Sequence, residues 1–208
     1  VAEDLPNASF AGQQDTYLNI VTEDDLIYYI KKCISSLFNS RAISYRKKNN
    51  ISYNDVKISI AIQKMIRSDI ASAGVGFSLD PNNGYNKSII INSAYGLGES
   101  VVSGMVTPDE FIVDKRALLE NANDPILSKK IGNKHLKIVY EEGSTTKEIS
   151  TLSNEINTLS IDDTTIVELS NIILKLEKYY SEIHNNSNMS IDVEWAIDGL
   201  DNKLYIIQ

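Results

Sequence analysis

The spacing of apolar residues along the chain predicts both strands and helices. Apolar positions alternate with polar or small ones across residues 56–62, and this period of two predicts a half-buried β-strand. A helix is predicted after Thr22, where Asp25 stands three residues on in the manner of a capping box. Its apolar face consists of Leu26, Ile30, Cys33, Ile34, Leu37 and Phe38. The same kind of spacing predicts a longer amphipathic helix over about residues 166–180.

Shorter apolar runs bounded by turn residues predict the remaining strands. The run SIIIN from Ser88 is continuously apolar, which is typical of a strand buried on both faces. Other strands are expected at GVGFSLD, EFIVDK and HLKIVYEE, and a closing hairpin at SIDVEWAI and KLYIIQ. The polar stretch 143–163 predicts a surface excursion, and residues 116–134 carry no clear pattern. Strands and helices follow one another without a βαβα rhythm, so the predicted fold class is α+β.

Two carboxylates project from one face of the predicted closing hairpin. In SIDVEWAI, residues 191, 193 and 195 point one way while Asp192 and Glu194 point the other, about 6–7 Å apart. The return strand brings Gln208 close to them. Two carboxylates and an amide oxygen suit Mg²⁺, which takes hard oxygen ligands together with substrate phosphates. An ordinary solvent-facing strand is the alternative interpretation.

The N-terminal run ASFAGQQDT has the composition of a phosphate-binding loop. The small residues between Ala8 and Gly12 let the backbone approach a ligand, and N–H groups in such a loop can cradle phosphate oxygens. Thr16 adds a hydroxyl. No Gly-Lys-Ser/Thr follows, so the loop is not a Walker A motif. A simple connecting loop is the alternative.

Two further segments have features of a nucleotide site. The run IQKMI, residues 62–66, stands where the alternating strand is predicted to end, and backbone groups at such an exit can hold adenine. In the run GLGES, Glu99 is placed to bind a ribose hydroxyl or simply to carry charge at a helix N-terminus. Each segment has an ordinary structural interpretation as the alternative.

Composition and charge exclude several classes of partner. Twenty Lys and Arg stand against 28 Asp and Glu, a net charge of −8, which argues against nucleic acid. An ATP site in such a chain must recruit local cations, backbone N–H groups or Mg²⁺. No apolar run approaches the roughly 20 residues of a membrane span. Cys33 is the only cysteine, so no internal disulfide forms, which fits a reducing compartment such as the cytoplasm.

Long motifs across the chain resemble one enzyme family, the phosphoenolpyruvate synthases (pyruvate, water dikinases). The motifs follow the family's order and are Ala2–Ile20, Arg41–Arg46, Ile62–Asp80, Ile91–Lys115, Ile131–Tyr140 and Ile191–Gln208. The resemblance implies that residues 1–208 form part of an ATP-grasp nucleotide-binding domain, incomplete at both ends. Family members use ATP to phosphorylate a histidine on a separate swivelling domain. The phosphoryl group then passes to pyruvate in a barrel domain, giving phosphoenolpyruvate, AMP and phosphate.

The resemblance also implies roles for individual residues. The phosphate-covering loop would contain Gly12, Gln13 and Thr16. The adenine hinge would consist of Gln63, Lys64, Met65 and Ile66, and Glu99 would be a further nucleotide contact. Mg²⁺ and the phosphates would be held by Glu194 and Gln208, with Asp192 beside them.

The chain begins at Val1 and stops at Gln208 inside a strand-like run, so we expect sequence to continue on both sides. The phosphohistidine would then lie downstream, no catalytic residue is expected in this chain, and the chain alone would not turn over. Rifamycin phosphotransferases and pyruvate phosphate dikinases are related alternatives, and a non-catalytic nucleotide-binding module is an alternative from another class. A homodimer of the complete protein is a further expectation.

Overall fold

The computed structural model describes residues 4–5, 8–9, 14–186 and 189–208. The chain divides into two compact units, a smaller one of residues 1–65 with 141–146 and a larger one of residues 66–140 with 147–208. Helices are mixed with antiparallel strands, which confirms the α+β class. The chain therefore passes between the two units at residues 65/66, 140/141 and 146/147.

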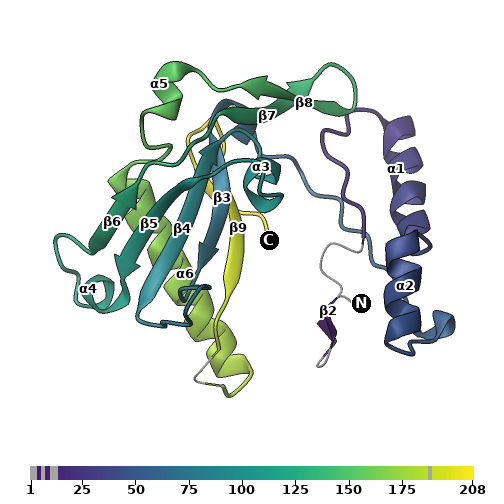
Figure 1. Cartoon of the computed structure of the whole chain (residues 1–208), viewed down its shortest axis with the longest axis horizontal. Helices are drawn as coiled ribbons and strands as arrows, with labels where there is room; N and C mark the ends of the chain where they lie inside the picture. The colour runs from purple at the N-terminus through teal and green to yellow at the C-terminus, as the bar shows by residue number, and fades with distance from the viewer. Residues whose placement is uncertain (1–3, 6–7, 10–13, 187–188) are drawn as a thin grey trace. The chain divides into compact units, whose positions relative to one another are not determined.

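A six-stranded antiparallel sheet forms the centre of the larger unit, in the order β10-β9-β3-β4-β5-β6 (Figure 1). The bounds are β3 Ser72–Phe77, β4 Ser88–Tyr95, β5 Asp109–Asp114, β6 Ile126–Lys130, β9 Asp192–Ile197 and β10 Leu204–Ile206. The predicted burial of β4 on both faces is confirmed, because three consecutive isoleucines, residues 89–91, are at most 5% exposed. The predicted closing hairpin is confirmed as β9 and β10.

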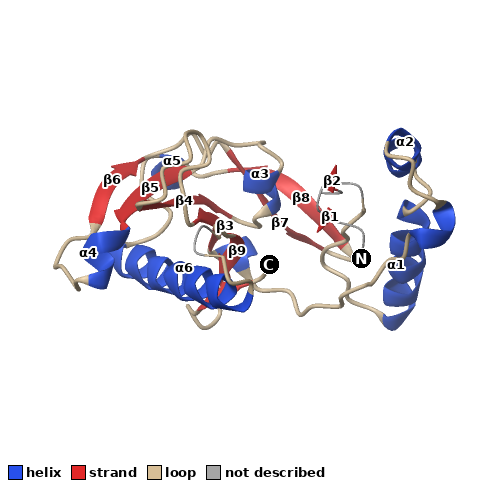
Figure 2. Ribbon diagram, turned by 90° about the horizontal axis from the view of Figure 1, so that it is seen from below, coloured by secondary structure: helices blue, strands red, loops and turns tan. Residues whose placement is uncertain are grey.

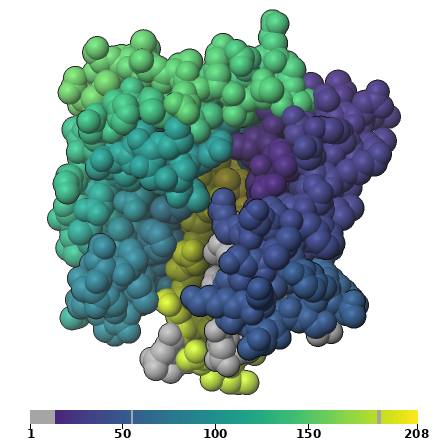
Figure 3. All heavy atoms as spheres, turned by 45° about the vertical axis from the view of Figure 1, so that its right-hand side comes forward, coloured from purple at the N-terminus to yellow at the C-terminus, as the bar shows by residue number. Residues whose placement is uncertain are grey.

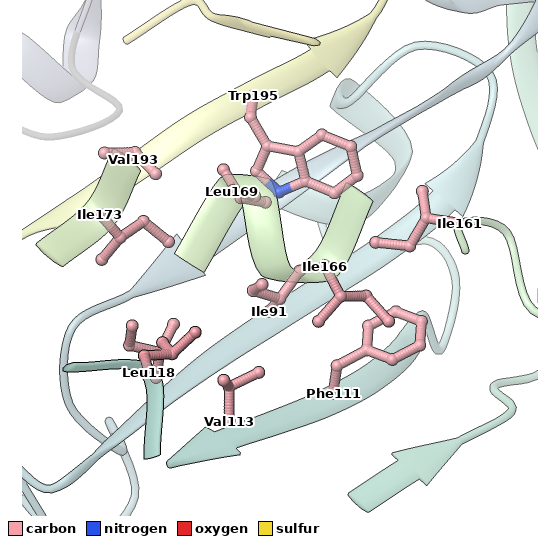
Figure 4. Close-up of a cluster of buried hydrophobic side chains, with 11 residues drawn as sticks. Ile91, Phe111, Val113, Leu118, Ile161, Ile166, Leu169, Ile173, Val193 and Trp195 are labelled. Atoms are coloured by element: carbon pink, nitrogen blue, oxygen red, sulfur yellow. The ribbon is translucent and has the colours of Figure 1, made fainter. Parts of the chain in front are cut away.

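Helix α6, Asp163–Ile183, lies along one face of this sheet (Figure 2). Its apolar stripe packs on alternate residues of the strands, and the shared core is Ile89, Ile91, Phe111, Val113, Leu118, Ile161, Ile166, Leu169, Ile173, Val193 and Trp195 (Figure 4). Gly76 of β3 permits this approach, because a β-carbon there would lie 2.6 Å from Cδ1 of Ile173. Packing on one face only leaves the opposite face of the sheet free of α6.

Short elements complete the larger unit. They are the 3-10 turn Ser68–Ile70 and the helices α3 Glu99–Val102, α4 Lys115–Leu119 and α5 Ser153–Ile156. Strands β7, Leu136–Glu141, and β8, Thr145–Ser150, form a separate two-stranded sheet, whose turn and adjoining strand ends, residues 141–146, belong to the smaller unit. Gly96 adopts a φ of +88°, and a β-carbon there would lie 2.7 Å from the carbonyl oxygen of Ile138. The GLGES segment therefore needs this glycine to pass close to β7.

The smaller unit contains two helices and little sheet. Its elements are β1 Asp4–Leu5, β2 Ala8–Ser9, α1 Glu23–Ser36, α2 Ser40–Lys48 and the 3-10 turn Tyr53–Asp55. Thr22 is the N-cap of α1, as predicted. The carboxylate of Asp25, however, accepts from the hydroxyls of Thr22 and Ser144 rather than closing a capping box. Part of the predicted apolar face is exposed, including Phe38 at 62%.

The strand predicted over residues 56–62 is wrong. Side chains 56, 58 and 60 are half-buried and 57 and 59 exposed, so the alternation of burial is present, but Ile62 is 67% exposed. A strand also requires a partner for its backbone hydrogen bonds, and in the described part of the chain no strand pairs with this segment. The segment therefore carries a strand-like pattern without belonging to a sheet.

Several elements lie where the sequence showed no pattern or a different one, and α4 is among those in the stretch 116–134. Strand β6 falls in the unassigned stretch 116–134, and β8 with α5 falls in the predicted surface excursion 143–163. All residues of β6 except Ile126 are exposed, which explains why no alternation of apolar residues marked it. These strands are fixed by pairing with a neighbour rather than by their own hydrophobicity.

A buried ion pair joins three segments of the larger unit. Lys134 and Asp109 have fully buried side chains and form a salt bridge. The Asp109 carboxylate also accepts from the backbone N–H of Gly132 at 2.9 Å and from that of Ser160 at 2.7 Å. The ammonium group of Lys134 donates in addition to the carbonyls of Gly132 and Ile156. Each charge is thus compensated inside the protein, and neither partner is replaceable alone.

We predict that Lys134→Met destabilises the protein by about 3–5 kcal/mol, because it leaves the Asp109 carboxylate buried without its cation. The matched control is Lys129→Met, which breaks an exposed pair with Asp163 and should cost no more than about 1 kcal/mol. Urea unfolding of the two variants measures both values. Equal losses of stability would contradict the role assigned to the buried pair.

Candidate functional site

The carboxylates of β9 lie on the sheet face opposite α6. Val193 and Trp195 are buried in the core beneath α6, so Asp192 and Glu194 point to the other side. Asp192 is exposed and Glu194 is half-buried. Atoms of the C-terminal strands (yellow) are visible at the surface in the space-filling view (Figure 3). The predicted orientation of the two carboxylates is therefore confirmed.

Gln208 pairs directly with Glu194. The N–H of Glu194 donates to the carbonyl of Gln208 at 2.9 Å, and the N–H groups of both Ile207 and Gln208 donate to the carbonyl of Glu194 at 2.8 and 3.3 Å. Two residues of one strand thus oppose a single residue of the other, which is the hydrogen-bond pattern of a β-bulge. The bulge brings the backbone of Gln208 opposite the half-buried carboxylate, as the sequence predicted.

The environment of Glu194 favours its neutral form. Burial raises the pKa of the Glu194 carboxyl, and the charge of Asp192 two residues earlier raises it further. Both effects disfavour a second negative charge at this point of the sheet. A cation placed beside the two carboxylates would reduce this penalty.

The donor set around Glu194 fits Mg²⁺ only in part. Among the residues described, His, Cys, Asp and Glu side chains nowhere gather in a group of three or more that could hold a metal ion. Two carboxylates and the Gln208 amide are nevertheless the hard oxygen donors that Mg²⁺ takes when phosphates and water supply the rest. The chemistry of these donors therefore suits Mg²⁺ delivered with a phosphate ligand rather than a metal caged by protein alone.

The predicted adenine segment crosses the boundary between the units. Residues 63–65 belong to the smaller unit and Ile66 to the larger one. Gln63 and Lys64 are exposed, and Met65 and Ile66 are half-buried. The Ile66 carbonyl accepts from the N–H of Ser68 and from the hydroxyl of Tyr140. The segment has no regular secondary structure, so its backbone is not committed to a sheet or helix.

The other predicted contacts are placed unevenly. Glu99 is exposed at the start of α3 in the larger unit, and its carbonyl accepts from Ser103. Thr16 is exposed and belongs to the smaller unit. Gly12 and Gln13 lie outside the described residues. The structure therefore brings together Asp192, Glu194 and Gln208, while the roles of all the predicted site residues stay predictions.

Asn19 is a structural anchor that the sequence analysis missed. Its backbone has a φ of +57°, and its side-chain amide donates to the carbonyls of Glu141, Gly143 and Thr145 at 3.1, 3.1 and 2.6 Å. These contacts fix the chain that follows Thr16 to the tip of the β7–β8 hairpin. No local sequence pattern predicts the contact between Asn19 and Glu141, because the two residues are 122 positions apart and meet only in the folded chain.

Comparison with known proteins gives one consistent result. All 208 residues match the family model described as pyruvate phosphate dikinase, AMP/ATP-binding domain. The chain is 45% identical to the phosphoenolpyruvate synthase of Helicobacter pylori, 43% to that of Synechocystis and 40% to that of Escherichia coli. Each match covers 100% of this chain but only 26%, 25% and 26% of the relative. The chain thus spans about a quarter of the length of these relatives.

In the described residues, no helix combines the length and the apolar character that spanning a bilayer requires.

The raised pKa of Glu194 predicts a pH-dependent effect of Glu194→Gln in the absence of metal. The folded protein holds this proton more tightly than the unfolded chain, so the free energy of unfolding falls as the pH rises above the ordinary value of 4.5. Glu194→Gln should therefore raise the melting temperature at pH 7, and the gain should vanish below about pH 4. The control Glu168→Gln, at an exposed position of α6, should show no such pattern. Thermal unfolding at both pH values tests this, and a gain that persists at low pH would argue against titration of Glu194.

Proposed function

This chain belongs to the family of pyruvate phosphate dikinase AMP/ATP-binding domains, and from that premise we propose that it is the nucleotide-binding part of a phosphoenolpyruvate synthase. The relatives named above favour the synthase over a rifamycin phosphotransferase or a pyruvate phosphate dikinase, because all three are phosphoenolpyruvate synthases at 40–45% identity. The finer fold assignment, an incomplete ATP-grasp domain, is part of the same proposal.

The observation that carries the proposal is the arrangement of Asp192, Glu194 and Gln208 on the face of the sheet that α6 leaves free. Glu194 is half-buried beside Asp192 and its pKa is raised, so its charged form would be stabilised by a ligand that brings positive charge. ATP arrives in water as its magnesium complex and meets this requirement, whereas a neutral or purely anionic ligand does not.

Different residues of this chain would then contact different parts of the nucleotide. Glu194 and Gln208, with Asp192 beside them, would hold Mg²⁺, which when bound neutralises phosphate charge and orients the phosphates. Residues 63–66 would present backbone groups to the adenine, and Glu99 would reach a ribose hydroxyl. Gly12, Gln13 and Thr16 would cover the phosphates through backbone N–H groups and the threonine hydroxyl.

The complete reaction would need parts beyond this chain. In the proposed scheme ATP, pyruvate and water give AMP, phosphoenolpyruvate and phosphate, and a histidine of a swivelling domain carries the phosphoryl group between two sites. That domain and a pyruvate site are proposed for the rest of the complete protein, together with its assembly as a homodimer and its location in the cytoplasm. This chain would bind and orient the nucleotide, and positioning of this kind is a main part of catalysis in phosphoryl transfer.

We predict that Glu194→Ala weakens the binding of Mg-ATP at least about tenfold, a loss of about 1.4 kcal/mol, because one of two metal-binding carboxylates is removed. Isothermal titration of the complete protein measures the change. The control Glu168→Ala removes an equal charge from α6, on the other face of the sheet, and should leave the affinity unchanged. Tight binding that Glu194→Ala does not affect would place the metal elsewhere.

We also predict that residues 1–208 alone form no phosphoenolpyruvate from ATP, Mg²⁺ and pyruvate. The proposed phosphohistidine and pyruvate site lie in other domains, so the chain should bind nucleotide weakly and stop there. A coupled assay for phosphoenolpyruvate, with the complete protein as positive control, is the measurement. Formation of phosphoenolpyruvate by the isolated chain would refute the assignment of the phosphohistidine and the pyruvate site to other domains.

A further inference from the structure

The carbonyl of Ile66 is already fully engaged inside the protein. It accepts from the N–H of Ser68 at 2.8 Å and from the hydroxyl of Tyr140 at 3.3 Å. A backbone carbonyl has two lone pairs, and these two donors use both of them. A base that binds the segment 63–66 must therefore find its backbone acceptor before Ile66. The Ile66 carbonyl is a fixed end of the segment and not one of its contact groups.

Tyr140 is held in place as a donor by Arg67. The guanidinium of Arg67 lies 5.2 Å from the centre of the Tyr140 ring, within the range of a cation–π contact. That guanidinium is fixed in turn by two hydrogen bonds, at 2.8 and 3.0 Å, to the two carboxylate oxygens of the buried Asp69. Burial raises the pKa of Tyr140 to about 12, so the hydroxyl keeps its proton at neutral pH.

The same cluster is connected to the hairpin that carries Glu194. The carbonyl of Arg67 accepts from the N–H of Gly199 at 3.1 Å, in the turn between β9 and β10. Gly199 packs so closely on Ile70 that a β-carbon would lie 2.5 Å from Cγ1 of that side chain. The residues that follow Ile66 and the turn of the β9–β10 hairpin are thus joined by one backbone hydrogen bond and by the packing of Gly199 on Ile70, within the larger unit.

The Tyr140 hydrogen bond also joins two of the places where the chain passes between the units. Ile66 is the first residue of the larger unit after the passage at 65/66, and Tyr140 is the last before the passage at 140/141. A hydrogen bond between these two residues fixes both connections to the same point of the larger unit. Tyr140 therefore fixes the last residue of the segment 63–66 within the larger unit.

We infer that Tyr140, supported by Arg67, is a positioning residue for adenine: its hydroxyl holds the Ile66 carbonyl and so sets the backbone that receives the base. The inference rests on the proposed function, since it assumes that residues 63–66 contact adenine. It assigns no contact between Tyr140 and the nucleotide. Its consequence is that Tyr140 acts on ligands that contain adenine and not on the phosphates alone.

The test compares three ligands on Tyr140→Phe in the complete protein: AMP, Mg-ATP and Mg-tripolyphosphate. The substitution keeps the ring against Arg67 and removes only the hydroxyl. AMP and Mg-ATP should bind about fivefold more weakly, the effect of one hydrogen bond, and tripolyphosphate should bind as in the wild type. Arg67→Lys, which cannot make the same bidentate contact with Asp69, should give the same pattern.

The matched control is Tyr95→Phe, which removes a hydroxyl that donates to the carbonyl of Leu159 at 3.1 Å in the same unit. It should leave the binding of all three ligands unchanged. Unchanged AMP affinity in Tyr140→Phe would overturn the inference, and so would an equal loss for all three ligands, which would indicate a general structural role. A wild-type protein that binds neither AMP nor Mg-ATP would instead refute the proposed function, and the inference would fall with it.

Discussion

The packing of α6 on one face of the six-stranded sheet decides where the polar residues of that sheet lie. Because strand side chains alternate, burying Val193 and Trp195 against α6 places Asp192 and Glu194 on the other face. The strand register extends this arrangement across the sheet, because residues directly opposite one another share a face: Glu194 pairs with Val75, and Val75 pairs with Asn92. A shift of β9 by one residue would exchange the two sets, exposing the tryptophan and burying two carboxylates. The energy of the core thus holds the candidate site in position, although no site residue belongs to the core.

The ion pairs of the larger unit leave the two carboxylates of β9 without a lysine partner among the pairs found. Several of its lysines are committed to internal pairs, namely Lys115 with Glu177, Lys129 with Asp163, Lys134 with Asp109 and Lys137 with Glu155. Asp192 and Glu194 are instead left close to each other, and the pKa of Glu194 is raised by its burial first and by the charge of Asp192 second. A chain of net charge −8 offers little long-range attraction to a polyanion, so binding has to depend on local neutralisation.

Local patterns predicted those parts of the fold whose residues make their main contacts with one continuous apolar layer. Helix α6 and the β9–β10 hairpin were predicted from the period of their apolar residues, and strand β4 from its continuous apolar run, because each buries those residues in the core. The same reasoning failed for residues 56–62, where the apolar alternation is real but no strand is available to pair with it. It also failed for β6, which is mostly exposed and is defined by its hydrogen bonds to β5.

For the candidate site, the carboxylates of β9 were predictable from the two-residue period. The β-bulge that aligns Gln208 depends on pairing geometry and was not.

The sequence could not reveal the contacts made near the positions where the chain passes between the two units. Asn19 holds the tip of the β7–β8 hairpin, and Tyr140 holds Ile66, in each case across more than 70 positions of sequence. Tyr140 satisfies a backbone carbonyl at the end of an irregular segment, whereas Asn19 satisfies carbonyls of the β7–β8 strands and of the turn between them. Irregular backbone is what a ligand-binding segment requires, since its N–H and C=O groups must remain available to the ligand. An irregular segment has no helix or sheet to hold its ends, so other residues must hold them. Tyr140, which is distant in sequence, holds the Ile66 end of the segment 63–66 in this way.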